Sequence, residues 1–338
     1  MKFIKDHILL LSIILTVGMS NAQDVHYSQF YLSPLTTNPA NTGNIDGDWR
    51  FAGNFRNQWR SLGRPFISTS FSYDQNFFVY NEHLSGGLMF MHDESGLVNL
   101  RLEKIMASLA YHKSFDIHSF HIGFQPGYAI KAADLNGTSL PDQYDRNTGG
   151  FNSNLPTSDP YIQAQLSYFD FNAGLAYGID LGKAHPEVGF AMFHLTKPQE
   201  TFYNNDNRLP VRYIFNAKSE IEVLDVLSVM PYGMYMMHNK ASELVIGANA
   251  IFHLPENNSK ATGIYGGLMF RNGFNRNTDA AIAVAGIRYT HLEIGVNYDI
   301  NVSELKLATD NKGAFEISLV YTSLSTLLKK TAIPCDRY

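Results

Sequence analysis

Residues 169–180 read FDFNAGLAYGID, and large or apolar side chains occupy every second position of this stretch. Residues 66–74 (FISTSFSYD) and 291–300 (HLEIGVNYDI) show the same alternation. Successive side chains of a β-strand point to opposite faces. Each stretch therefore predicts a strand with one apolar face and one face of small or polar residues.

A membrane β-barrel fits this pattern better than the alternative, a soluble secreted β-sandwich, which would also alternate. The segments are long, about 9–12 residues, as expected for tilted strands that cross a bilayer. Aromatic residues lie near the ends of the apolar faces, as in the interfacial girdles of barrels. The opposite faces are rich in Gly, Ser, Asn, Asp and Arg, which suits a hydrated lumen.

The sequence contains about fourteen such segments, an even number as expected for a single-chain outer-membrane barrel. We predict strands at 48–57, 65–75, 84–93, 103–114, 119–132, 167–179, 187–196, 210–221, 227–238, 242–253, 261–270, 279–289, 291–300 and 313–322. Methionines blur the alternation at 84–93 and 227–238. If the first strand runs outward, the long links 133–166, 197–209 and 301–312 fall on the extracellular side, where barrels carry their longer loops.

Composition narrows the function classes. Of 338 residues, 17% are charged and 13% aromatic, and the formal net charge is -5. Ordinary soluble domains carry about 25% charged residues. The acidic balance excludes nucleic acid as the main partner, because phosphate binding needs a basic face. The single cysteine, Cys335, excludes a disulfide framework and any cysteine-based zinc site.

The sequence divides into four parts. Residues 1–22 carry Lys2 and Lys5, an apolar run and a small-residue cleavage site, and they predict a cleaved secretory signal peptide. The run is too short to span a membrane as an anchor. Residues 23–47 are turn-rich and predict an irregular segment that plugs the barrel mouth. The barrel then covers 48–322, and 323–338 form a periplasmic tail.

The sequence motifs predict a protein that is not an enzyme and has no cofactor or metal. The sequence contains neither G-x-S-x-G nor H-E-x-x-H. A Ser–His esterase would remain an alternative, because its residues need not be adjacent in sequence. His112, His118 and His121 are near one another in sequence, but His118 falls in an expected turn. The run from Asp134 to Asp145 resembles a calcium loop, yet it has Ser139 where that loop requires glycine.

Basic residues lie on the polar faces of the first and eighth segments: Arg50, Arg56, Arg212 and Lys218. A Lys or Arg on the lipid face would cost about 2–4 kcal/mol at mid-membrane, so we place these residues in the lumen. The acidic partners that we expect for them are Asp170, Asp180, Glu293 and Asp299. This favours a salt-bridged or plugged lumen over the alternative of an anion-conducting pore.

Several motifs together resemble the PorP/SprF family. The opening motifs are Gln29-Phe30-Tyr31, Pro34-Leu35, Asn38-Pro39-Ala40, Thr42-Gly43 and Arg56-Asn57-Gln58-Trp59. The central and closing motifs are Tyr168–Gly174, Gly189–Pro198 with His194-Leu195, Leu209-Pro210, Arg212-Tyr213, Gly313–Tyr321 and the end of the tail, Cys335-Asp336-Arg337-Tyr338. Asp336 and Tyr338 depart from the Cys-Pro-Arg-Phe tail of the family.

The resemblance implies an outer-membrane barrel of the type IX secretion system that supports secretion or surface anchoring of an adhesin through its C-terminal domain, and in gliding species gliding motility. The implied partners are that adhesin, other secretion components and outer-membrane lipid. We expect the link 133–166 to bind the adhesin through apolar anchors. These anchors are Pro141, Tyr144, Phe151, Pro156 and Tyr161. The alternatives are a diffusion channel for small solutes and a scaffold for gliding machinery that binds through periplasmic turns and the tail.

Overall fold

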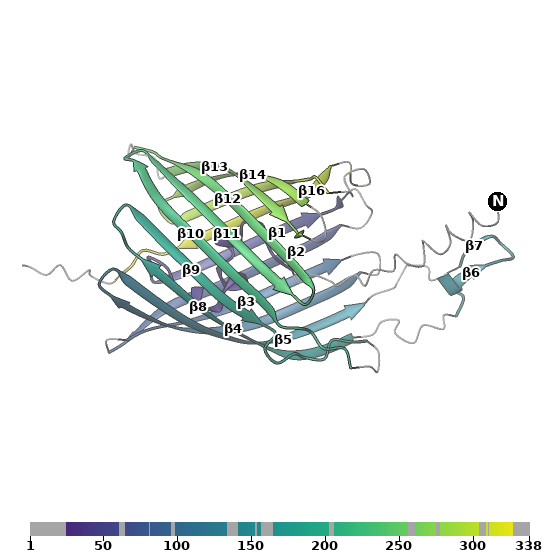
Figure 1. The fold of residues 1–338 in the computed structure, drawn as a ribbon. Coiled ribbons are helices and arrows are strands. Elements are labelled where there is room, and N and C mark those ends of the chain that lie inside the picture. The colour runs from purple at the N-terminus through teal and green to yellow at the C-terminus, as the bar shows by residue number, and fades with distance from the viewer. Residues whose placement is uncertain are drawn as a thin grey trace, which may run out of the picture.

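Fourteen antiparallel strands form a closed barrel in the computed structural model (Figure 1). The structure describes residues 25–60, 65–80, 82–95, 99–133, 141–152, 154–156, 165–202, 206–255, 261–274, 278–303, 309 and 311–326. The barrel strands are β1 (Trp49–Gln58), β2 (Phe66–Val79), β3 (Glu82–Ser95), β4 (Leu100–Phe115), β5 (His118–Ala133), β8 (Gln165–Ile179), β9 (Ala184–Phe193), β10 (Arg212–Leu224), β11 (Leu227–His238), β12 (Ala241–His253), β13 (Ala261–Asn272), β14 (Thr278–Tyr289), β15 (Leu292–Asn301) and β16 (Lys312–Thr322). Each pairs with its neighbours in the chain, and β1 closes the barrel against β16. No helix in the described part of the chain is long and apolar enough to cross a bilayer.

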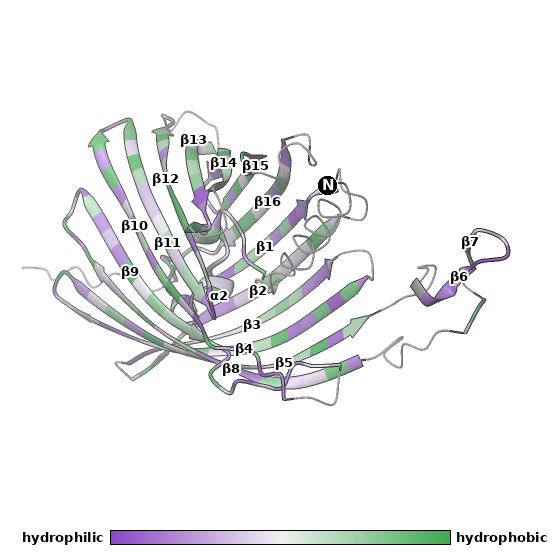
Figure 2. Cartoon of the chain, turned by 45° about the vertical axis from the view of Figure 1, so that its right-hand side comes forward, coloured by the Kyte–Doolittle hydropathy of each residue, from purple (hydrophilic) through white to green (hydrophobic). Residues whose placement is uncertain are grey.

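Alternation of side chains around the barrel wall confirms the predicted fold class. On β1, Arg50, Asn54 and Arg56 are buried inside the barrel, whereas Phe51 faces outward. Large apolar side chains such as Leu109 and Leu268 are exposed on the outer surface. Apolar and polar bands alternate along the strands (Figure 2). An apolar outer surface of this kind is stable when lipid surrounds it.

Four strands, β2, β4, β9 and β10, have a boundary that differs from the prediction by three or four residues. The segment expected at 187–196 is β9, Ala184–Phe193, because His194 takes a left-handed backbone conformation with φ of 62° that ends the strand. The segment expected at 210–221 is β10, Arg212–Leu224, which runs through an irregular register between Glu222 and Leu224. The two segments with blurred alternation are the strands β3 and β11, as predicted.

The two ends of the barrel carry different connections. One end has links 59–65, 96–99, 134–164, 194–211, 239–240, 273–277 and 302–311. The other end has links 80–81, 116–117, 180–183, 225–226, 254–260 and 290–291. We call these the long-loop end and the short-turn end.

Aromatic rings mark both ends of the wall. At the short-turn end, Trp49 stacks on Tyr321 with ring centroids 5.3 Å apart. At the long-loop end, the rings of Trp59 and Phe66 meet edge to face at 5.0 Å. Barrels place such rings at the two membrane–water interfaces, so the rings bracket the membrane-spanning part of the wall.

Candidate functional site

Residues 25–47, which we call the inner segment, lie inside the barrel. Its short helical turns are η1 (Phe30–Leu32), α2 (Pro34–Thr37) and η2 (Pro39–Asn41). Figure 2 shows α2 within the ring of strands. Prolines at the start of α2 and η2 suit these turns, because a first helical residue needs no backbone N–H partner. Most side chains between Tyr27 and Thr42 are buried.

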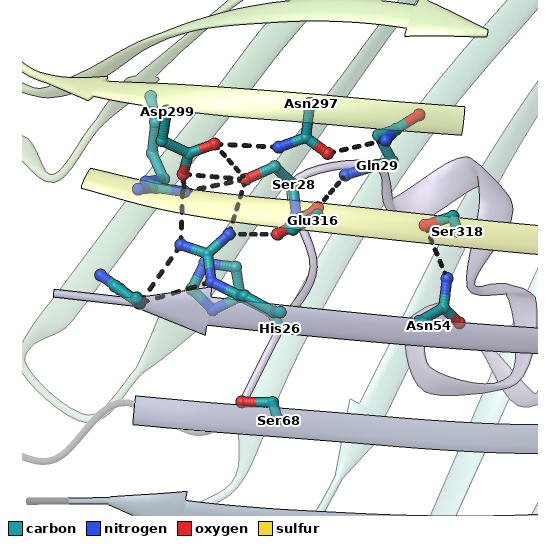
Figure 3. A network of polar contacts seen from close by, with 12 residues as sticks. His26, Ser28, Gln29, Asn54, Ser68, Asn297, Asp299, Glu316 and Ser318 are labelled. Carbon is teal, nitrogen blue, oxygen red and sulfur yellow. Dashed lines mark hydrogen bonds and ion pairs between the residues drawn. The ribbon is translucent and has the colours of Figure 1, made fainter. Parts of the chain in front are cut away.

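A buried charge cluster holds the start of the inner segment (Figure 3). Arg56 forms ion pairs with Glu316 and, at 3.2 Å, with Asp299. Arg271 reaches the same Asp299 carboxylate at 2.9 Å. The backbone N–H of Ser28 donates to Glu316 at 2.8 Å. Two guanidinium groups therefore face two carboxylates here, and the inner segment supplies hydrogen bonds that buried charges require.

Side chains of the inner segment complete this cluster. Both arginines donate to the Ser28 hydroxyl, Arg56 at 2.9 Å and Arg271 at 3.0 Å. The Gln29 amide donates to Asn297 at 2.7 Å, and Asn297 in turn donates to Asp299 at 2.9 Å. Each strand group thus has a partner within the cluster or on the inner segment, and this fixes the position of Ser28 and Gln29.

A second ion pair holds the far part of the inner segment. Arg50 pairs with Asp74 at 2.7 Å and donates to the Asn41 carbonyl at 2.8 Å. Asp74 also accepts from the Gly43 N–H at 2.6 Å. His112 contacts the Thr42 carbonyl at 2.9 Å. The inner segment is therefore attached to the barrel wall at both of its ends.

Phe30 and Tyr31, which follow Gln29 in the inner segment, contact a different surface of the barrel interior. The inward faces of β9–β14 form an apolar wall: Ala191, Phe193, Ile214, Met230, Tyr232, Met234, Met236, Val245, Ile251, Tyr265, Met269, Ala280, Ile282 and Val284. Phe30 packs into this cluster and meets Tyr232 edge to face at 5.9 Å. The expectation of a hydrated lumen is wrong on this side, because methionine and branched aliphatic residues point inward.

Small residues make room for the turn Asn38-Pro39-Ala40 against β5, β8 and β9. A Cβ at Gly123 would overlap the Pro39 backbone, and a Cβ at Gly174 would overlap the Asn38 side chain. The Asn38 amide donates to the Leu175 carbonyl at 2.9 Å and contacts the Phe190 carbonyl at 3.5 Å. Glycine is required where a backbone approaches this closely.

Two small cavities lie where the inner segment meets the wall. One cavity of about 20 Å³ lies beside Val25 and Arg212, and another of about 20 Å³ lies beside His26 and Glu243. His26 and Glu243 are 2.7 Å apart. The volumes are of the order of one water molecule, so neither cavity is large enough for a solute.

The predicted ion pairs are correct for one residue. Arg56 pairs with Asp299, as expected. The other expected acids pair locally: Asp170 with His194, Asp180 with His185, and Glu293 with Arg288. The other three basic residues have partners that the prediction did not name. Arg50 pairs with Asp74, and Lys218 pairs with Glu187. The Arg212 guanidinium lies 4.4 Å from the Phe193 ring centroid. Period-two alternation gives the face of a residue but not its neighbour across strands.

The histidines and acids do not assemble a metal site among the described residues. His112 and His121 contact each other through their Nδ1 atoms at 2.6 Å, but His118 contacts Tyr177 instead, at 2.7 Å. Residues 134–140 of the calcium-like run lie outside the described residues, and the Asp145 carboxylate accepts from the Asn147 N–H at 2.9 Å.

The link 134–164 carries a two-stranded hairpin beyond the long-loop end of the barrel (Figure 1). A short turn, η4 (Pro141–Gln143), leads into β6 (Tyr144–Asp145), which pairs with β7 (Gly150–Phe151). The Tyr144 and Phe151 rings meet edge to face at 5.3 Å, and these side chains remain 46% and 60% exposed. Gly149 has a φ of 70° in the connecting turn, a conformation that favours glycine.

Four of the five predicted partner-binding residues lie in the described part of the link 134–164. The structure brings Tyr144 and Phe151 together, and it places Pro156 at an exposed position of the same link. The backbone of Pro141 begins η4. Tyr161 lies outside the described residues, as do the signal segment 1–22 and the end of the tail from 327.

Solved structures similar to this chain are outer-membrane barrels. A TodX variant, described as a monoaromatic hydrocarbon channel, is 8% identical, with a TM-score of 0.50 and coverage of 86% of this chain and 94% of that chain. CymD, also described as a monoaromatic hydrocarbon channel, is 9% identical, with a TM-score of 0.48 and coverage of 90% and 95%. BamA from Haemophilus ducreyi is 8% identical, with a TM-score of 0.42 and coverage of 81% and 70%. At these identities the likeness shows the fold alone.

Sequence comparison gives the family. No curated protein matches the chain. The family described as type IX secretion system membrane protein PorP/SprF matches residues 19–321, which is most of the chain. The chain therefore belongs to the PorP/SprF family of type IX secretion system membrane proteins.

Proposed function

We propose that this barrel holds a secreted adhesin at the cell surface by binding its C-terminal domain at the long-loop end. Barrels place their longer loops outside the cell, so the long-loop end faces the medium. The observation that carries the proposal is the β6–β7 hairpin, which presents the Tyr144 and Phe151 rings on a hydrogen-bonded scaffold. Exposed aromatic anchors are the residues on which protein–protein interfaces most depend.

The filled lumen favours this function over a diffusion channel. The inner segment has charged contacts at both ends and apolar contacts between them, and the spaces beside it are of the order of one water molecule. A closed barrel of this kind serves as a fixed support in the membrane. Binding then takes place on the loops rather than through the lumen.

Replacing both aromatic anchors tests the proposed binding surface. The double variant Tyr144→Ala/Phe151→Ala should release the adhesin into the medium, because each central aromatic anchor contributes about 2 kcal/mol or more, about 30-fold in Kd. The measurement is quantitative immunoblotting of cell-bound and released adhesin. The matched control is Tyr80→Ala, a 99% exposed aromatic at the short-turn end, which should change neither fraction. An adhesin that stays on cells of the double variant contradicts the proposal.

Removing the inner segment tests whether it closes the lumen. A variant lacking residues 24–45 should conduct ions in planar bilayers, whereas the full-length mature protein should show little conductance. A heat-shift gel checks that the variant barrel is folded. Equal conductance of the two folded proteins would contradict a plug and would favour the alternative of a diffusion channel.

A further inference from the structure

A large hollow lies on the outer wall, in the half of the barrel near the short-turn end. It has a volume of about 610 Å³. Side chains of two cross-strand rows line it on β4, β5, β8, β9 and β10: Tyr111, Ile122, Leu175, Phe190 and Phe215 in one row, and Lys113, Phe120, Tyr177 and Val188 in the other. All of these point away from the lumen, so the hollow opens toward lipid.

The inner segment contacts the wall on the lumen side, directly opposite the floor of the hollow. Ala176 and Gly189 contribute to this floor and carry little or no side chain. On the lumen side, a Cβ at Gly189 would lie 2.8 Å from Asn38 Nδ2. Asn38 also donates to the Leu175 carbonyl at 2.9 Å. The wall is therefore thin at this point and is held in place by the turn behind it.

The rim of the hollow near the short-turn end carries charge of both signs. The Lys113 ammonium lies 3.0 Å from both carboxylate oxygens of Glu82, and the Tyr111 hydroxyl donates to the same carboxylate. Lys113 and Glu82 are both partly exposed. Glu82 and Lys113 lie at the short-turn end, next to the links 80–81 and 116–117. Barrels have their membrane–water interfaces near the two ends of the strands. An ammonium and a carboxylate thus sit side by side where a lipid headgroup would lie.

We propose that this hollow binds a phospholipid with a phosphoethanolamine headgroup from the periplasmic leaflet. One acyl chain lies against the aromatic and aliphatic rows. The headgroup phosphate meets the Lys113 ammonium, and the headgroup ammonium meets the Glu82 carboxylate, which the Tyr111 hydroxyl holds in place. Charges of opposite sign face each other in both contacts.

An acyl chain is the occupant that the apolar lining favours. Water would find few partners in the hollow, because an ordered water needs two to four polar groups. An empty hollow would lack the packing contacts that a hydrocarbon chain supplies. A phosphoglycerol headgroup offers Glu82 no cation, so the carboxylate disfavours an anionic lipid. The rim therefore selects among phospholipids by headgroup.

Competition between two lipids tests the headgroup contact. The mature full-length protein is incubated in detergent with equal amounts of phosphatidylethanolamine and phosphatidylglycerol with the same chains, and retained lipid is counted by native mass spectrometry. We expect phosphatidylethanolamine to be retained preferentially. Glu82→Gln should reduce this preference by about two- to fivefold, the range that one exposed ion pair supplies. Glu200→Gln is the matched control, since Glu200 pairs with Lys131 near the long-loop end.

Filling the hollow tests the acyl-chain contact independently. Val188→Trp places an indole in the hollow and should remove most of the retained lipid, whereas Leu268→Trp, on the exposed outer face of β13, should not. A heat-shift gel verifies that both barrels are folded. The proposal is overturned if the two tryptophan variants retain equal lipid, or if wild-type protein shows no headgroup preference.

Discussion

The two sides of the lumen hold the inner segment in different ways. On β1, β2, β15 and β16 the inward face is a polar wall with Arg56, Asp74, Asp299 and Glu316. On β9–β14 the inward face carries the apolar wall, together with some polar side chains such as Arg271, which belongs to the charge cluster. Ser28 and Gln29 bond to the polar wall, while the next residue, Phe30, packs into the apolar wall. The two kinds of attachment thus meet at consecutive residues, Gln29 and Phe30, where η1 begins.

The difference indicates a division of roles between the walls. Hydrogen bonds to buried charges depend on direction, so the polar wall fixes the register of the inner segment. Apolar packing depends little on direction but stabilises in proportion to the area removed from water. We therefore expect the polar wall to be intolerant of single changes and the apolar wall to adapt to them.

Breaking the polar wall should have the largest effect. Arg56→Ala leaves the buried Glu316 carboxylate without its cation and leaves Asp299 paired with Arg271 alone. Loss of one partner from a buried ion pair typically costs about 3–5 kcal/mol. The free energy of unfolding should fall by this amount in urea titrations of the detergent-solubilised barrel, followed by tryptophan fluorescence.

A surface ion pair provides the control for Arg56. Arg208 pairs with Asp206 at 2.9 Å, and both side chains are largely exposed. Arg208→Ala should change the unfolding free energy by no more than about 1 kcal/mol. If Arg56→Ala costs as little as Arg208→Ala, the cluster around Ser28 does not anchor the inner segment.

Truncating the apolar wall should have a smaller effect. Met234 is fully buried on β11, and Met234→Ala should cost about 2–3 kcal/mol, at the low end for loss of a buried methionine, because neighbouring methionines can fill part of the space. The same urea titration measures it. Met234→Leu should cost less than about 1.5 kcal/mol. A loss for Met234→Ala larger than that for Arg56→Ala would reverse the proposed roles of the two walls.

The same two walls explain which parts of the fold the sequence predicts. Strands such as β1 and β8 alternate cleanly because their inward residues are polar, and their ranges agree closely with the prediction. On β3 and β11 the inward residues Met89 and Met234 are as apolar as the lipid-facing ones. The blurred alternation there marks inward methionines that pack against the inner segment: Met234 in the apolar wall with Phe30, and Met89, outside both walls, with Leu35.

The site was less predictable than the barrel. Alternation places Arg50 and Arg56 inside, but the partners of such residues depend on the register between strands that lie far apart in sequence. The Arg56–Glu316 pair, for example, follows from the closure of β1 on β16. The outer hollow could not be predicted from the sequence, because it depends on small residues from two neighbouring strands, Ala176 on β8 and Gly189 on β9, that lie in front of the inner segment.

The smallest of these effects is expected where the inner segment meets the wall through glycine. Gly174→Val would push its side chain into Asn38, and overpacking of this kind costs about 1–3 kcal/mol. Gly266→Val on β13 is the matched control, because a Cβ there meets nothing closer than a carbonyl at 3.7 Å. The same urea titration compares the two variants. If both have the same stability, the turn Asn38-Pro39-Ala40 does not pack closely on β8, and only the two walls hold the inner segment. If Gly174→Val alone loses stability, the close contact of Gly123 and Gly174 with the turn Asn38-Pro39-Ala40 is a third attachment of the inner segment. It acts through shape rather than through charge or apolar area.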